Sequence, residues 1–398
     1  MDPFGRLPWF ALHNILSALP DLPTLHSLHN ASPDVAAFLQ GNNDLFAHIV
    51  DSIMESTARE RGLPPIVQRA VRYLVTIWTA QSKRERQQQD SDQNILNSLR
   101  YLAEKYSNHP TPIPTTISPS TPAAILCRLL ALMTRLRCLV HASFHDMVSK
   151  ALQLKIEHLP RKAAYINTRG VGPAHRPQGV PHTPVDVGPL MWIEEQRLLG
   201  SFLWIVIFYE LRRIYGDFTV PPVRGETVYI SSLDTAETFW KKILCGDNNT
   251  QREQIATTLQ WLDIKCGGRE NISSLLSSSP LPLPNTYQHR YPESTTLSDK
   301  EWETEEEWIS NAFSTHGALC LWEARVSPIS PLRCVDYAVF RPYGLIFWSV
   351  RRMDGLGFRE AFDAGHHMWF ALSFVLNQED WDEVVKWQAE RGFDPRAV

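Results

Sequence analysis

No stretch of this 398-residue sequence stays apolar long enough to cross a lipid bilayer. The longest apolar run, from Leu198 to Tyr209, covers 12 residues, whereas a membrane-spanning helix needs about 20. The opening residues, Met1-Asp2-Pro3, lack the basic and apolar regions of a secretory signal. We therefore expect a protein of the cytoplasm or nucleus that has no membrane partner.

A large excess of charge of either sign is also missing. The chain carries 39 Lys and Arg against 43 Asp and Glu, for a formal net charge of −4. Nucleic-acid binding requires a strongly basic face, so we expect no nucleic-acid partner. Apolar residues make up 43% of the chain and charged residues 21%, which is typical of a soluble globular protein of two or three domains.

Paired cysteines and metal-binding motifs are scarce. No two of the six cysteines are spaced as Cys-x-x-Cys, so we expect mostly buried, reduced thiols; they are Cys127, Cys138, Cys245, Cys266, Cys320 and Cys334. His141 and His145 stand one helical turn apart and could face one ion, but a metal site needs a third ligand. The adjacent pair His366-His367 diverges on a helix. We expect no bound metal.

Catalytic signatures are absent as well. The sequence has no nucleophile elbow, no phosphate-binding loop, no kinase motif set and no complete dinucleotide fingerprint. We therefore expect no enzymatic activity, no catalytic residues and no cofactor. An enzyme without a recognisable motif stays open as the third alternative.

Helical patterns dominate what the sequence does contain. Ser32-Pro33-Asp34 places a cap and a first-turn proline before a helix that Gly41 ends. Apolar residues recur at three- and four-residue steps in further segments, and this spacing predicts helices; the segments are 44–61, 66–88, 92 onward, 123–158, 191–215, 298–312, 358–376 and 378–391. Only residues 337–350 favour a short strand pair, and no fixed-period repeat occurs. The prediction is a mostly α fold.

Three proline-rich segments interrupt these helices. Residues 108–122 and 160–189 carry five and six prolines, a density that helices and central strands do not tolerate. A third segment covers 277–284. We expect a first segment over 1–42, a helical body over 43–158 with an accessible linker at about 108–122, and a second part of the body over 190–398 after a long loop at about 160–189.

The N-terminus carries two short amphipathic helices. Pro20 separates them, and their apolar residues fall at helical spacing; these are Leu12, Ile15, Leu16 and Leu19 in the first helix and Leu22, Leu25 and Leu28 in the second. Two helices within about 40 residues cannot bury all this apolar surface between themselves. Their apolar stripe must pack on the rest of the chain or on a partner.

This segment resembles the F-box. That motif opens with Leu-Pro and continues with apolar residues four, seven and eleven positions after the proline, matched here by Leu7, Pro8, Leu12, Ile15 and Leu19. Phe10 stands where the motif commonly has an acidic residue. The resemblance implies docking on a Skp-family adaptor protein of a cullin–RING ubiquitin ligase, while the remaining chain recruits a protein target.

The closer likeness is to the divergent F-box-like openings of uncharacterised filamentous-fungal proteins. Leu19-Pro20-Asp21-Leu22 and Ala31-Ser32-Pro33 are similar to their N-terminal pattern. Those chains also carry a helical body with a Glu-Glu-Gln-Arg helix and a late Tyr-Gly-x-x-Phe-Trp segment. In this chain, Glu194 to Arg197 and Tyr343 to Trp348 match these two features.

Two functions follow from this likeness. The first is a non-catalytic F-box-like adaptor whose docking face comprises Leu7, Pro8, Leu12, Ile15, Leu16, Leu19, Leu22 and Leu25. The alternative is a helical interaction or structural protein whose F-box-like helices belong to its own core and bind no adaptor. Burial of the stripe discriminates between them, because a face already covered by the body is not free to dock.

Overall fold

The computed structural model describes most of the chain. The described residues are 2–56, 62–84, 95–96, 98–99, 114–158, 179–220, 228–231, 233–244, 249–277, 316–326, 330–359 and 368–390. The helix predicted over 298–312, the cap at Asp92 and most of the predicted loop at 160–189 lie outside them.

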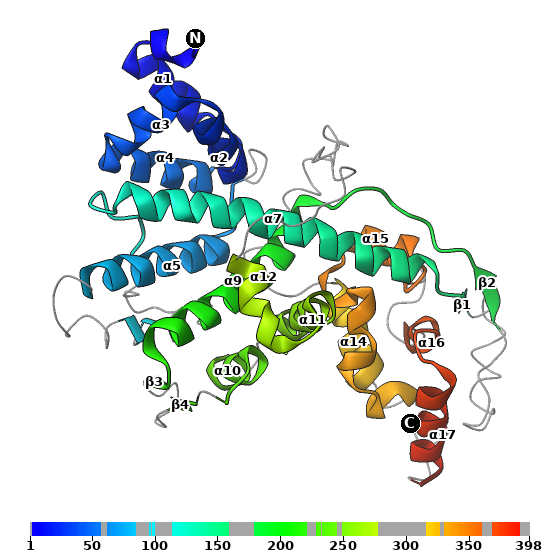
Figure 1. Cartoon of the computed structure of the whole chain (residues 1–398). Helices are drawn as coiled ribbons and strands as arrows, with labels where there is room; N and C mark the ends of the chain where they lie inside the picture. Colours follow the sequence, from blue (N-terminus) through cyan, green and yellow to red (C-terminus); the bar gives the residue numbers. More distant parts are fainter. Residues whose placement is uncertain are drawn as a thin grey trace. The chain divides into compact units, whose positions relative to one another are not determined.

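The described chain is mostly helical, as the sequence predicts (Figure 1). The α-helices are α1 (Trp9–Ser17), α2 (Leu22–Ala31), α3 (Pro33–Gln40), α4 (Asn43–Glu55), α5 (Pro65–Arg84), α7 (Ala123–Leu152), α9 (Trp192–Tyr215), α10 (Ala236–Ile243), α11 (Asn249–Cys266), α12 (Ile272–Ser277), α14 (His316–Val326), α15 (Val350–Gly355), α16 (Met368–Ser373) and α17 (Gln378–Glu390). Within the described residues, no helix is long and apolar enough to span a membrane.

Two short antiparallel strand pairs accompany the helices. The strand β1 (Ile156–His158) pairs with β2 (Val180–His182), and β3 (Phe218–Val220) pairs with β4 (Val228–Ile230). The helix predicted to run to residue 158 therefore ends at Leu152. The β-branched Ile156 is fully buried in β1, and its pairing partner comes from the segment that the sequence predicts as a loop.

The predicted strand pair at 337–350 is wrong. This segment forms consecutive 3-10 turns, at Tyr337–Val339, Arg341–Tyr343 and Leu345–Phe347. Gly344 between the last two has a φ of +64°, a left-handed conformation that strands do not contain. The indole N–H of Trp348 donates to the carbonyl of Tyr343 at 2.9 Å, so the chain closes on itself instead of extending.

The helix predicted over 44–61 also ends early. Ser56 follows α4 in an extended conformation, with a ψ of 155°. The Leu63 N–H donates to the Met54 carbonyl at 2.8 Å, and the Gln68 side chain donates to the same oxygen at 3.0 Å. These two bonds satisfy the Met54 carbonyl near the end of α4 in place of a further helical turn.

The chain divides into two compact units. The first comprises Met1–His141, Glu195–Arg290 and Thr295–Ala312, and the second comprises Ala142–Glu194, Tyr291–Ser294 and Phe313–Val398. The first unit contains the whole F-box-like segment. Its core includes α9. Trp204 is buried against Trp240, with the ring centroids 4.5 Å apart, and the Trp240 indole donates to the Trp204 carbonyl at 3.1 Å.

A buried ion pair lies at the centre of the second unit. The side chains of Glu194 and Arg352 are 0% and 1% exposed and lie 2.9 Å apart. Glu194 also accepts hydrogen bonds from Ser349 and from the Met191 N–H, and the Arg352 guanidinium lies 4.6 Å from the centre of the Phe144 ring. A buried charge pair is tolerated only when its remaining donors and acceptors are satisfied, and here they are.

Candidate functional site

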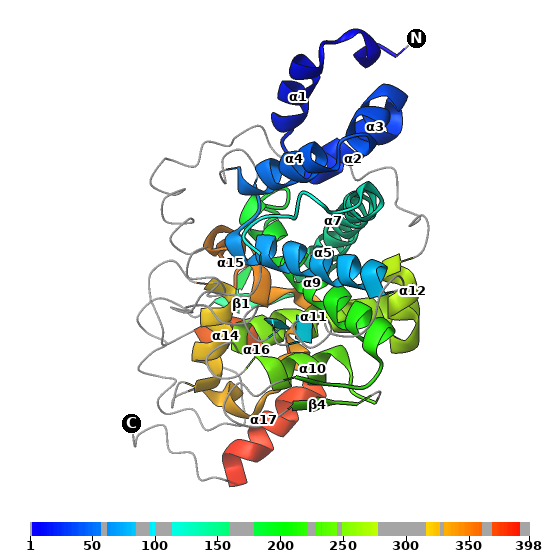
Figure 2. The same ribbon diagram turned by 90° about the vertical axis from the view of Figure 1, so that its left-hand side faces the viewer.

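Residues 1–42, whose sequence resembles the F-box, form α1, α2 and α3 in the first unit, and α4 follows them. Asp21 caps α2 by accepting from the Thr24 N–H at 2.8 Å, and Ser32 caps α3 by accepting from the Val35 N–H at 3.1 Å. The cap at Ser32 and the end at Gly41 confirm the predicted helix. Both ribbon views place α1 at the outer end of this group, with α2 and α4 between α1 and α5 (Figures 1 and 2).

The predicted apolar stripe is divided between the interior and the surface. Leu12 and Leu16 are 4% and 0% exposed, and α1 packs against α4. Leu22 and Leu25 of α2 are also buried, whereas Leu19 is half-buried. Four of the eight predicted docking residues, Leu12, Leu16, Leu22 and Leu25, are therefore already covered by other parts of the chain.

The other predicted residues remain exposed. Leu7 and Ile15 are 38% and 40% exposed, and Pro8 is also at the surface. Sequence reasoning missed two larger neighbours, Trp9 and Phe10, which are 68% and 55% exposed and whose rings meet edge to face at 6.3 Å. We call Leu7, Pro8, Trp9, Phe10 and Ile15 the α1 surface. The sequence did contain a signal for Trp9 and Phe10, because two adjacent aromatic residues directly follow Leu7-Pro8 and do not belong to the helical spacing of the leucines.

Polar contacts hold α2 on α7. The guanidinium of Arg137 lies 2.8 Å from the carboxylate of Asp21 and 3.1 Å from that of Glu195. The hydroxyl of Thr134 lies 3.0 Å from the ring of His26. Arg137 is thus salt-bridged to two carboxylates from other parts of the first unit.

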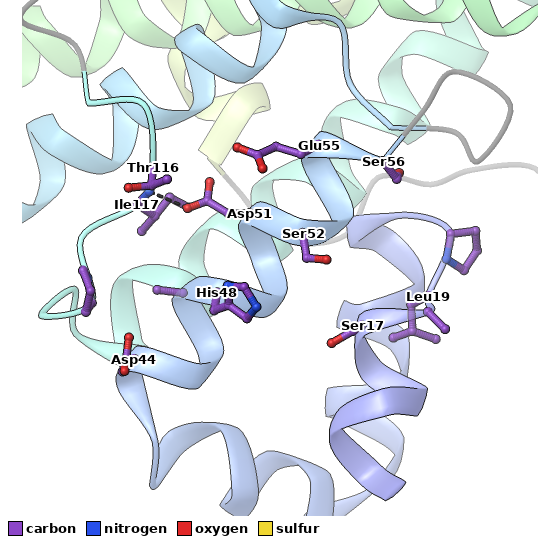
Figure 3. Close-up of a pocket in the computed structure, with 14 residues that line it drawn as sticks. Ser17, Leu19, Asp44, His48, Asp51, Ser52, Glu55, Ser56, Thr116 and Ile117 are labelled. Carbon is purple, nitrogen blue, oxygen red and sulfur yellow. Dashed lines mark hydrogen bonds between the residues drawn. The ribbon is translucent and has the colours of Figure 1, made fainter. Parts of the chain in front are cut away.

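An open pocket of about 880 Å³ lies beside the end of α1 (Figure 3). One wall is the polar face of α4, which contributes Asp44, His48, Asp51, Ser52 and Glu55. The other walls are more apolar and come from the end of α1 and from the proline-rich segment after residue 114; they include Ala18, Leu19, Pro20, Ile117 and Pro119. Part of the predicted accessible linker thus belongs to a folded wall, in which Ile117 is 5% exposed.

Asp51 joins this wall to the helices. Its carboxylate accepts from the Ile117 N–H at 2.5 Å and pairs with the Arg72 guanidinium at 3.0 Å. Burial raises the pKa of Asp51, although these two partners act in the opposite direction. A second nitrogen of Arg72 lies 2.5 Å from Glu55, which is 51% exposed. Both oxygens of Asp51 are therefore engaged, while Glu55 and the exposed Asp44 face solvent.

The histidine pair does not assemble a metal centre. His141 lies 3.5 Å from the carboxylate of Glu195, and His145 meets the ring of Phe144 at 5.0 Å. In the part of the chain that the structure describes, no three potential ligands come together around one point.

Comparison with known proteins does not assign the chain to a family. No protein-family profile, no curated protein and no solved structure matches the chain.

Proposed function

We propose that this chain is a non-catalytic, F-box-like adaptor that docks on a Skp-family protein of a cullin–RING ubiquitin ligase and recruits a protein target. The observation that carries the proposal is the α1 surface. It coincides with the Leu7-Pro8 start of the F-box-like pattern, and Trp9 within it is 68% exposed.

Exposed aromatics of this size are unusual without a partner. A soluble chain rarely leaves neighbouring large apolar side chains in water, and such groups mark interaction sites. Trp9, Phe10, Leu7 and Ile15 all fall within nine consecutive positions. Trp is among the residues that contribute most to binding energy when an interface covers them.

A specific observation also favours the alternative, a helical interaction or structural protein that binds no adaptor. Leu12, Leu16, Leu22 and Leu25 are part of the core of the first unit, and Arg137 ties α2 to α7. In this reading, the F-box-like helices stabilise their own fold, and the α1 surface contacts another protein.

Co-elution of the purified full chain with a purified Skp-family adaptor tests the proposal. We expect the wild type to co-elute and Trp9→Asp to lose binding, because the charge would be desolvated at the interface. Trp322→Asp on α14 is the matched control, since Trp322 is also an exposed helical tryptophan, at 52%. Failure of the wild type to co-elute, or equal loss in both variants, would favour the alternative.

A further inference from the structure

The pocket beside α4 combines an acidic wall with apolar ones. Asp44, Asp51 and Glu55 are its carboxylates, and none of its 14 lining residues is Lys or Arg. Arg72, behind the wall, compensates one of the two charges of Asp51 and Glu55. The three carboxylates and the one guanidinium leave about two negative charges, and the exposed carboxylates are those of Asp44 and Glu55.

The size and rigidity of the pocket suit a ligand. Its volume of about 880 Å³ falls in the range of about 300–1,000 Å³ that is usual for binding sites. Its loop wall is fixed, because the Ile117 N–H is bound to the buried Asp51. A ligand would therefore meet a largely preformed surface and lose little free energy in ordering the protein.

We propose that this pocket binds a segment of a partner protein that carries two basic residues flanking an apolar one. Lys and Arg place an aliphatic stem on apolar surface while their charged end reaches a carboxylate. The pocket offers both surfaces, since the apolar walls that include Leu19 and Ile117 lie beside the acidic face of α4. This inference does not rest on what binds the α1 surface.

The geometry of α4 sets the spacing of the basic residues. Asp44 and Glu55 are eleven positions apart, which corresponds to about 16 Å along a helix. An extended peptide rises about 3.3 Å per residue, so basic residues four positions apart, with flexible side chains, can reach both carboxylates. Between them, the apolar residue would face Leu19 and Ile117.

The test is fluorescence anisotropy with the full chain and a labelled peptide, Gly-Arg-Ala-Leu-Ala-Arg-Gly. We expect saturable binding that the same peptide with Glu in place of Arg does not show. The double variant Asp44→Asn/Glu55→Gln should weaken binding about fivefold, because both basic side chains of the peptide lose their carboxylate partners. Raising salt from 0.1 to 0.5 M should weaken wild-type binding as well.

A matched variant tests whether peptide binding depends on the carboxylates of the pocket or only on the net charge of the protein. Glu379→Gln/Glu383→Gln removes two exposed carboxylates of α17, one of them in its first turn, as Asp44 is in α4. This variant should bind the peptide as tightly as the wild type. No saturable binding, binding of the Glu peptide, or equal weakening by both double variants would each overturn the proposal. Melting temperatures of all proteins confirm that the fold is retained.

Discussion

Arg137 of α7 forms a partly buried ion pair with Asp21, the residue that caps α2. The two side chains are 12% and 16% exposed and lie 2.8 Å apart, and the same guanidinium reaches Glu195 of α9, whose side chain is 4% exposed. The ion pair with Arg137 thus connects α2 to α7, while Trp9 and Phe10 at the start of α1 are exposed to solvent.

Replacing Arg137 should destabilise the fold. Arg137→Met leaves the carboxylates of Asp21 and Glu195 without their cation, and an uncompensated buried charge costs about 3 kcal/mol or more. Chemical denaturation of the full chain measures this loss. Arg128→Met on the same helix is the control: Arg128 is 43% exposed and pairs with Glu210, so its loss should cost about 1 kcal/mol. Equal losses would show that Arg137 has no anchoring role.

Removing one member of the Glu194–Arg352 pair should cost more than removing both. Arg352→Met leaves Glu194, 0% exposed, as an unpaired charge, with an expected cost of about 3–5 kcal/mol. The double variant Glu194→Met/Arg352→Met should recover part of that stability, because no isolated charge remains. A double variant that is destabilised by the sum of the single changes would contradict this view.

His182 should make the stability of the second unit depend on pH. Burial, together with the charge of His158, lowers the pKa of His182, and the two rings stack with centroids 4.3 Å apart. Below pH about 6.5, the ordinary value for His, the unfolded chain takes up a proton that the folded chain resists. Stability should therefore fall as pH decreases from 7 to 5, and His182→Gln should flatten that slope. An unchanged slope would exclude His182 as its cause.

Adjacent positions of α1 should respond differently to the same change. Leu16→Asp places a carboxylate in a position that is 0% exposed and should destabilise the fold by about 3 kcal/mol or more. Ile15→Asp, at 40% exposure, should change stability by about 0.5 kcal/mol. Thermal melting of the two variants measures the contrast. Similar melting temperatures would mean that α1 does not pack on α4 as described.

Local signals predicted some of the helices but missed α10, α11, α12 and α14. Ser32, Pro33 and Gly41 delimit α3 because caps and breakers act on the backbone within a few residues, and the apolar run of α9 required burial. The same local reasoning failed at 337–350, where aromatic and β-branched residues suggested strands. There Gly344 and the Trp348 side chain close turns, and tertiary packing decides the conformation over propensity.

The proposed docking surface was only partly predictable from the sequence. Leucine spacing identified Leu12 and Leu16 as apolar residues of one face, but that face is covered by α4, and spacing alone does not reveal the covering helix. The contacts that shape the site join residues far apart in the chain, such as Asp51 with Ile117 and Asp21 with Arg137. Nothing in the local sequence links such pairs.

The proposed docking of α1 on a Skp-family adaptor can be measured directly. The most direct measurement is isothermal titration of the full chain with that adaptor, comparing the wild type with Ile15→Asp and with Ile264→Asp, a helical isoleucine that is 63% exposed elsewhere in the same unit. The account predicts wild-type binding that Ile264→Asp retains and Ile15→Asp weakens by at least about tenfold, the equivalent of about 1.4 kcal/mol. Absence of wild-type binding, or equal affinity of the two variants, would contradict it.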